Sequence, residues 1–322
     1  MVTPKETGAV AEMPPPTRFA DKAFEWLTLA MALTVVLLVF MVGWQLDRGS
    51  ELSIKRFGWN FLITSTWDPV AEHFGALPFI YGTLVSSLIA LIIAVPLSIA
   101  TAVFLTELAP LRIRQPLVSL IEMLAAIPSV ILGLWGIFVM VPWLRDYPFA
   151  FLKRTLGWTP FFSGPVYGTS MLAGGIIIAI MIMPIITSVS REILRSVPNL
   201  QREAAYALGA TRWEVTRIAV LSYAQKGLFG AVILGLGRAL GETMAVTMVI
   251  GNTPQISVSL FAPGYTLASV IANEFTEATT DLYLHALVEI GLVLFAITIA
   301  SNLVAQVFLK TMSMGSATRA VQ

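Results

Sequence analysis

Six long apolar segments constrain the fold of this chain more than any other feature of its sequence. An α-helix rises about 1.5 Å per residue, so about 20 apolar residues cross the roughly 30 Å hydrocarbon core of a bilayer. The chain has 322 residues, of which 57% are hydrophobic and only 12% charged, whereas a soluble domain carries about 25% charged residues. We therefore expect an all-α polytopic membrane protein with six transmembrane helices, at roughly 26–44, 79–106, 117–143, 167–190, 227–251 and 285–309.

The placement of Lys and Arg between these segments predicts the orientation. With the N-terminus inside, the inner segments hold 13 basic residues and the outer loops hold six. Cytoplasmic loops carry the excess of Lys and Arg, so we expect both termini in the cytoplasm. The parts outside the spans are then a disordered, Pro-rich cytoplasmic tail at 1–25, a cytoplasmic tail at 311–322, a cytoplasmic loop at about 191–226 and external loops at 45–78, 144–166 and 252–284.

The sequence lacks the residues on which most catalytic and cofactor sites depend. It has no cysteine, which excludes disulfides, thiolate metal sites and cysteine nucleophiles. It has no G-x-x-x-x-G-K-[ST] loop for the phosphates of ATP, and no Ser/His/Asp constellation is supported. Its two histidines, His73 and His285, are far apart, whereas a metal site needs a cluster of ligands. We expect a chain that is not an enzyme, has no cofactor or metal, and contacts lipid but no nucleic acid.

The fifth segment carries two charges near its middle, Arg238 and Glu242, in "GLGRALGETMAV". Side chains four residues apart lie on one helix face within reach of each other. Small residues on that side (Ala231, Gly235 and Ala245) and the neighbouring G-x-x-x-G of Gly237 and Gly241 allow close helix packing. The charged face is therefore expected to point into a protein interface or a water-filled cavity rather than into lipid.

Two interpretations of this pair remain open. In the first, Arg238 and Glu242 neutralise each other and stabilise helix packing. In the second, Arg238 offers positive charge to an anion that crosses the bilayer, and Glu242 holds and balances it. A planar guanidinium that stays protonated suits a tetrahedral oxyanion. The remaining polar or helix-breaking residues within spans are interpreted as interfacial or capping groups (Glu122, Glu289) and as kinks (Pro128, Pro184).

The cytoplasmic loop "SREILRSVPNLQREAAYALGATRWEVTRIAVLSYAQKG" predicts two short helices that meet at a sharp corner. Pro198 and Asn199 suit a helix start, and Gly209 suits a left-handed stop. Thr211 and Glu214 have the spacing of a capping box for the next helix. An amphipathic helix lying on the membrane surface would have the same pattern.

Within this loop, "EAAYALGA" followed by "RIAVL" resembles the EAA motif of ABC importer permeases. In that family the motif forms a coupling helix that docks into a cleft on a separate ATPase subunit. The matching residues are Glu203, Ala204, Ala205 and Gly209, and Leu221 matches the family leucine. Ser222 stands where the family usually has proline, which bears on the geometry of the outgoing helix.

The wider chain is similar to phosphate-specific ABC importer permeases of the PstC type. The similarity covers roughly 74–308, through stretches such as "EMLAAIPSVILGLWGIFV" and "LFAPGYTLASVIANEF". It implies a five-helix, MetI-like permease core at 79–310 preceded by one extra helix, in a bacterial inner membrane. It also implies three partners: a homologous sister permease (PstA type), an ATPase dimer (PstB type) and an external phosphate-binding protein (PstS type) received by the outer loops.

Other functions compete with phosphate import. The same type of permease could carry another oxyanion such as molybdate or sulfate, or could be the sister phosphate permease. An ion-coupled carrier would work without an ATPase and often contains internal repeats, which we do not find in this sequence. A membrane-embedded enzyme would need a cluster of catalytic side chains.

Overall fold

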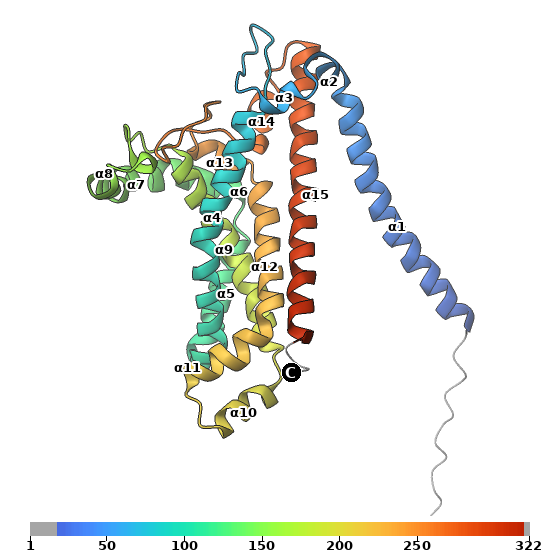
Figure 1. The fold of residues 1–322 in the computed structure, drawn as a ribbon, viewed down its shortest axis with the longest axis vertical. Helices are drawn as coiled ribbons and strands as arrows, with labels where there is room; N and C mark the ends of the chain where they lie inside the picture. The colour runs from blue at the N-terminus through green and yellow to red at the C-terminus, as the bar shows by residue number, and fades with distance from the viewer. Residues whose placement is uncertain (1–17, 319–322) are drawn as a thin grey trace, which may run out of the picture. The chain divides into compact units, whose positions relative to one another are not determined.

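The computed structural model describes residues 18–318, and these residues are almost entirely helical (Figure 1). Among them, β-pairing is limited to one isolated antiparallel bridge between Asp68 and His73. Six helices of the described chain are long and apolar enough to cross a membrane, which confirms the expected all-α fold and number of spans. They are Asp21–Gly49, Leu77–Leu108, Ser129–Leu156, Met171–Arg195, Arg212–Leu240 and Asp281–Thr311.

Figure 1 labels the α-helices in chain order. The π-helical segments η1, η2, η3 and η5 continue neighbouring α-helices, and η4 is a short 3-10 turn. The bounds are α1 (Arg18–Gly49), α2 (Glu51–Phe57), α3 (Asn60–Ile63), α4 (Leu77–Val103), η1 (Phe104–Leu108), α5 (Leu111–Ala125), α6 (Ser129–Trp135), η2 (Gly136–Met140), α7 (Val141–Leu144), η3 (Arg145–Phe149), α8 (Ala150–Leu156), η4 (Pro160–Phe162), α9 (Met171–Arg195), α10 (Asn199–Ala207), α11 (Arg212–Glu214), η5 (Val215–Leu221), α12 (Ser222–Leu240), α13 (Met244–Val249), α14 (Leu267–Glu274) and α15 (Asp281–Thr318).

The chain divides into an N-terminal unit that ends at Gln45 and a main unit that begins at Leu46. The described part of the N-terminal unit is α1, which is apolar between Trp26 and Trp44. Residues 18–25, expected in the disordered tail, are helical here because the helix begins at Arg18. The rest of that tail, 1–17, lies outside the described residues, as do residues 319–322 of the C-terminal tail. Residues 311–318 of that tail are helical, because α15 continues to Thr318.

Helix α9 is the centre of the main unit and packs against α4, α5, α12 and α13. Small residues allow this close packing. A Cβ on Gly175 would lie 2.5 Å from the Cγ2 of Ile89 in α4, and one on Gly174 would lie 3.2 Å from the Cγ1 of Ile250. The buried side chains of α9, including Ile177, form one hydrophobic core with those of α4, α6, α12 and α13. Its Pro184 does not interrupt the helix.

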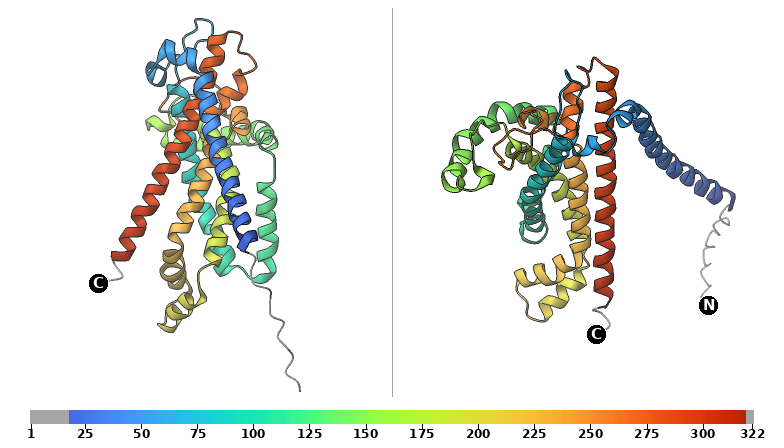
Figure 2. Two further views of the ribbon diagram at one scale, coloured as in Figure 1. Left: turned by 90° about the vertical axis from the view of Figure 1, so that its right-hand side faces the viewer. Right: turned by 45° about the horizontal axis from the view of Figure 1, so that its top comes forward.

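The third span, expected at 117–143 with a kink at Pro128, is broken at that proline. It is divided into α5 and α6 at residues 126–128, and Pro128 adopts an extended backbone (ψ 139°) at the start of α6. Proline has no N–H and clashes with the preceding turn, so it ends or kinks a helix. The helical path then continues through α7 and α8, which extend sideways from the bundle (Figures 1 and 2). Residues 144–156, expected in an external loop, are therefore helical.

The end of the main unit opposite α10 carries a cluster of packed aromatic rings, which we call the aromatic cap. Neighbouring rings in it have centroids 4.9–6.4 Å apart, and its members are Phe57, Phe61, Trp67, Phe74, Phe79, Tyr265 and Tyr283. Both the Trp67 Nε1–H and the Tyr283 hydroxyl donate to one carboxylate oxygen of Glu274, at 2.8 and 2.7 Å. Burial raises the pKa of the Tyr265 phenol above its usual value. The expected loops 45–78 and 252–284 are thus packed against each other and contain α2, α3 and α14.

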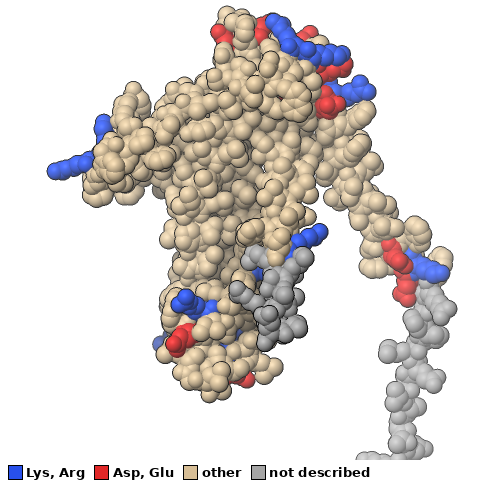
Figure 3. All heavy atoms as spheres, viewed as in Figure 1, with Lys and Arg blue, Asp and Glu red and all other residues tan. Residues whose placement is uncertain are grey.

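Charged residues of the main unit gather at two opposite ends in Figure 3. One end carries α2 and α3, and the other carries α10 and α11. Apart from the tip of α8, the surface in view between these ends shows almost no Lys, Arg, Asp or Glu. This distribution fits a bundle whose middle lies in hydrocarbon, where charged side chains are costly.

Candidate functional site

The fifth span is interrupted at the charged pair. A continuous helix was expected over 227–251, but α12 ends at Leu240 and α13 begins at Met244. Arg238 therefore lies in the last turn of α12, where a positive charge is favourable because helix dipoles place negative potential there. Glu242 lies in the break itself. The N-terminal end of this span is longer than expected, because the helix begins at Arg212 and continues through η5 into α12.

Contacts with α9 place this break beside the middle of α9, with Glu242 buried on one side and Gly241 and Met244 exposed on the other. Below the break, a Cβ on Gly235 would lie 2.6 Å from the Cδ1 of Ile186. Above it, Ile250 packs against Gly174 near the start of α9. The break thus lies beside the middle of a helix that crosses the membrane. Such non-helical backbone is tolerated at membrane depth where it is buried in protein or lines a cavity.

Arg238 and Glu242 form an ion pair in which the two side chains have opposite environments. The Arg238 Nη2 lies 3.3 Å from the Glu242 Oε2. The glutamate side chain is 4% exposed, whereas the arginine side chain is 48% exposed. The carboxylate is therefore held in the packed interior, and the guanidinium reaches from it to an open face of the chain.

That open face runs along α12 beside the packed one. No atom of the described chain lies within 4 Å of a Cβ built on Gly230 or Gly237, and Leu234 between them is 57% exposed. The three small residues expected to allow close helix packing lie in the core, since Ala231 and Ala245 are fully buried and Gly235 contacts Ile186. Among residues 18–318, no other helix packs against a Cβ built on Gly237 or Gly241.

The loop at 191–226 contains the predicted helices. Helix α10 begins at Asn199 after Pro198, and Gly209 has a left-handed φ of 83°. Thr211 and Glu214 form the predicted capping box at the start of α11. Ser222, at the position where the family usually has proline, lies in a helix that runs without interruption from Arg212 to Leu240.

Helix α10 presents an exposed surface at one end of the bundle. Glu203, Ala204 and Gly209 are exposed and Ala205 is half-buried. Apolar side chains stand among them, with Leu200 75% exposed and Leu208 90% exposed. A short helix that leaves large apolar side chains exposed offers a contact surface to another protein or to the membrane.

Arg202 holds α10 to the rest of the bundle. Its Nη2 donates to the Glu107 Oε1 at 2.9 Å and to the Leu194 carbonyl oxygen at 3.0 Å. Its Nη1 donates to the Val197 carbonyl oxygen at 2.7 Å. The side chains of Arg202 and Glu107 are 17% and 15% exposed, so this ion pair is poorly screened by water. One guanidinium thus joins α10 to the ends of two membrane helices.

Sequence reasoning did not single out Arg202 or Glu107. The two residues are 95 positions apart, and a charged residue in a basic loop is ordinary. A weak signal was available, because Glu107 lies near the end of the second expected span and Arg202 precedes the EAA stretch. Glu122, interpreted as interfacial, lies 3.6 Å from the Arg191 guanidinium of α9 and keeps a half-exposed side chain.

The fold and these two sites define a class of protein: a polytopic helical membrane protein with an exposed short helix at one end and an ion pair beside a broken helix in its membrane region. The family model of the binding-protein-dependent transport system inner membrane component matches residues 94–314. The chain belongs to this family.

Individual relatives are similar over most of their length. The phosphate transport system permease protein PstC of Mesorhizobium japonicum is 48% identical over 87% of this chain and 88% of its own. The protein of that name from Haemophilus influenzae is 49% identical over 86% and 89%. A solved structure of the MetNI methionine ABC transporter, in an inward-facing conformation, matches with a TM-score of 0.50 at 16% identity, over 78% of this chain and 95% of that one. This structural match supports the MetI-like fold alone.

Proposed function

We propose that this chain is a permease subunit of an ATP-driven importer that moves inorganic phosphate across the inner membrane. The observation that carries the proposal is the near-complete coverage of relatives named as phosphate transport permeases, at 48–49% identity. The open, half-exposed guanidinium of Arg238 supports the same substrate class, because phosphate carries negative charge near neutral pH and binds arginine through paired hydrogen bonds.

Coupling to ATP is assigned to α10. This helix would dock into a cleft on a separate ATPase dimer through Glu203, Ala204, Ala205 and Gly209. Hydrolysis of ATP by that dimer would then move α10. The ion pair of Arg202 with Glu107 and its bonds to the end of α9 would carry this movement into the membrane helices. In this proposal the chain itself hydrolyses nothing.

The translocation path is assigned to the open face of α12. A homologous sister permease would pack opposite this face, around a pseudo-two-fold axis. The broken helix and Arg238 would then line the space between the two subunits. Glu242 would keep the guanidinium in place and balance its charge when no anion is bound.

The capped end with α2, α3 and α14 is assigned to the outside, where a phosphate-binding protein would dock. Helix α10 and both chain termini would then lie in the cytoplasm. The excess of Lys and Arg in the segments on that side supports this orientation.

The test is reconstitution. The chain, tagged and purified together with its associated subunits, is placed in proteoliposomes, and uptake of radiolabelled phosphate is measured with ATP inside and the binding protein outside. We expect uptake to require both, and mass spectrometry to identify an ATPase and a second permease. Uptake driven by an ion gradient without ATP would contradict the proposal.

A competition arm separates phosphate from other oxyanions. Arg238 alone would attract any tetrahedral anion, so sulfate and molybdate are added in excess of labelled phosphate. We expect neither to reduce uptake strongly. Transport of labelled sulfate or molybdate in place of phosphate would assign the same machine to that anion.

A further inference from the structure

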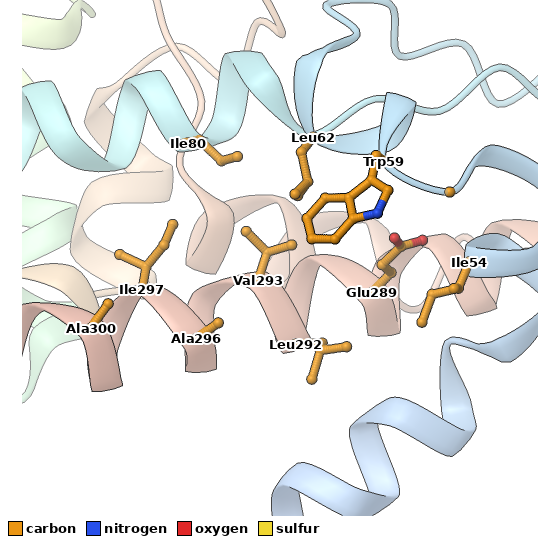
Figure 4. Close-up of a pocket in the computed structure, with 11 residues that line it drawn as sticks. Ile54, Trp59, Leu62, Ile80, Glu289, Leu292, Val293, Ala296, Ile297 and Ala300 are labelled. Carbon is orange, nitrogen blue, oxygen red and sulfur yellow. The ribbon is translucent and has the colours of Figure 1, made fainter.

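An apolar groove with one buried carboxyl group runs along α15 at a distance from the site described above. Its volume is about 680 Å³, and it lies between α15, α4 and the short helices α2 and α3. Figure 4 shows aliphatic side chains along its floor and walls and the carboxylate of Glu289 at one end, beneath the ring of Trp59. The aliphatic residues include Leu62, Ile80, Leu292, Val293, Ile297 and Ala300.

The length of the groove matches one leaflet of a bilayer. Glu289 and Ala300 mark its two ends on α15, and eleven residues of helix rise about 16 Å. Half of a hydrocarbon core roughly 30 Å thick is about 15 Å. Trp59, which is 85% exposed, stands at the Glu289 end, where an interfacial aromatic residue is expected.

Glu289 is the one acidic residue among the described residues that line this apolar groove. The residue is 6% exposed, and its Oε2 has no hydrogen-bond partner among the described residues. The Ser53 hydroxyl of α2 lies beside this carboxyl group and is also buried. A buried carboxyl oxygen costs free energy unless a donor or a positive charge reaches it. The groove therefore combines an apolar channel with a carboxyl oxygen that lacks a hydrogen-bond donor at one end.

We propose that this groove binds one phospholipid that carries a primary ammonium headgroup, in the leaflet away from α10. One acyl chain lies along α15 from Leu292 to Ala300. The ammonium group donates a hydrogen bond to the Glu289 carboxylate and neutralises its charge. Because the ammonium has N–H donors and a positive charge, it supplies the missing hydrogen bond at this end of the groove.

A protein helix fits the groove less well than an acyl chain. A helix with its side chains is about 10–12 Å wide, so it would cover the groove from outside rather than fill it along its length. A helix also offers no cation at the level of Glu289 unless a Lys or Arg is placed there. Such a helix is the competing outcome of the experiment.

The experiment uses the full chain with its associated subunits in nanodiscs. Trace phosphatidylethanolamine that carries a photoreactive diazirine on its acyl chain is compared with phosphatidylglycerol that carries the same chain and no ammonium. After illumination, adducts are mapped by mass spectrometry. We expect phosphatidylethanolamine adducts on residues 292–300, about tenfold more than from phosphatidylglycerol, a factor that corresponds to 1.4 kcal/mol.

Two variants and one control complete the design. Glu289→Gln keeps the size of the side chain and should lower phosphatidylethanolamine labelling to the phosphatidylglycerol level. Ala296→Phe fills the groove and should remove adducts from both probes. Leu303→Phe changes an exposed position of α15 outside the groove and should change neither. Equal labelling by both probes, labelling that survives Glu289→Gln, or no adducts in the unmodified complex would each overturn the proposal.

Discussion

The different environments of Arg238 and Glu242 indicate which of the two is fixed and which is available. Glu242 is buried in the helix break, whereas half of the Arg238 side chain is exposed on a face that the described chain leaves open. A purely structural pair would be expected to bury both partners. The geometry therefore favours a guanidinium that is held by the chain and offered to something outside it.

Replacing Arg238 with Gln should lower phosphate uptake at least about tenfold, because a charge-assisted hydrogen bond to the anion is lost. Glu242→Gln keeps the guanidinium but removes its buried counter-charge, so uptake should fall less. The measurement is radiolabelled uptake by complexes that assemble normally. Arg154→Gln, at an exposed position on α8, is the matched control. Uptake by Arg238→Gln at the level of this control would reduce the pair to a packing role.

The two faces of α12 differ enough to separate folding from association. At Gly235 an added Cβ meets Ile186 at 2.6 Å, whereas at Gly237 it meets open space in the described chain. The face with Gly235 therefore packs against α9 of the same chain, whereas the face with Gly237 contacts no other helix of the described chain.

Gly235→Val should therefore destabilise the purified chain by about 1–3 kcal/mol, the usual range for overpacking. Gly237→Val should leave its stability nearly unchanged and instead weaken the association with the sister permease. Thermal unfolding in detergent and the yield of co-purified permease measure the two effects. If Gly237→Val destabilised the chain as much as Gly235→Val, or if it did not change the yield, the assignment of the open face would be wrong.

The bonds that hold α10 to the bundle predict that a change at Arg202 has a larger effect than a change at Glu107. Arg202→Gln removes the ion pair with Glu107 and the bonds to the Leu194 and Val197 carbonyl oxygens. Glu107→Gln removes only the pair, so Arg202 still anchors α10 to the end of α9. The first change should reduce retention of the ATPase and phosphate uptake more than the second. Equal retention in both variants and the unmodified chain would show that Arg202 does not position the docking helix.

The absence of cysteine from the chain makes its orientation in the membrane directly testable. Val70→Cys lies in a loop at the capped end and is 96% exposed, and Ala204→Cys lies exposed on α10. With a membrane-impermeant maleimide, we expect Val70→Cys to be labelled in intact spheroplasts and Ala204→Cys only after permeabilisation. The reverse pattern would place α10 outside and remove the basis for coupling to ATP.

Apolar length and local helix signals could be predicted from the sequence. All six spans were expected because a bilayer requires about 20 apolar residues in a row whatever the neighbours are. The left-handed Gly209 and the capping box of Thr211 and Glu214 were expected because they depend on residues within one turn. Each of these features arises from short-range physics.

Breaks and long-range pairs could not be predicted in this way. Hydropathy averages over about 20 residues, so it predicted one span at 227–251 although α12 ends before Glu242. Pro128 signalled a kink, but not that the backbone would leave the helix between α5 and α6. The pair of Glu107 with Arg202 and the burial of Glu242 against the core depend on where α4, α9 and α12 meet. Side chains that are distant in sequence acquire their environment only when the helices pack, and that environment sets whether a charge is held, paired or exposed to a partner.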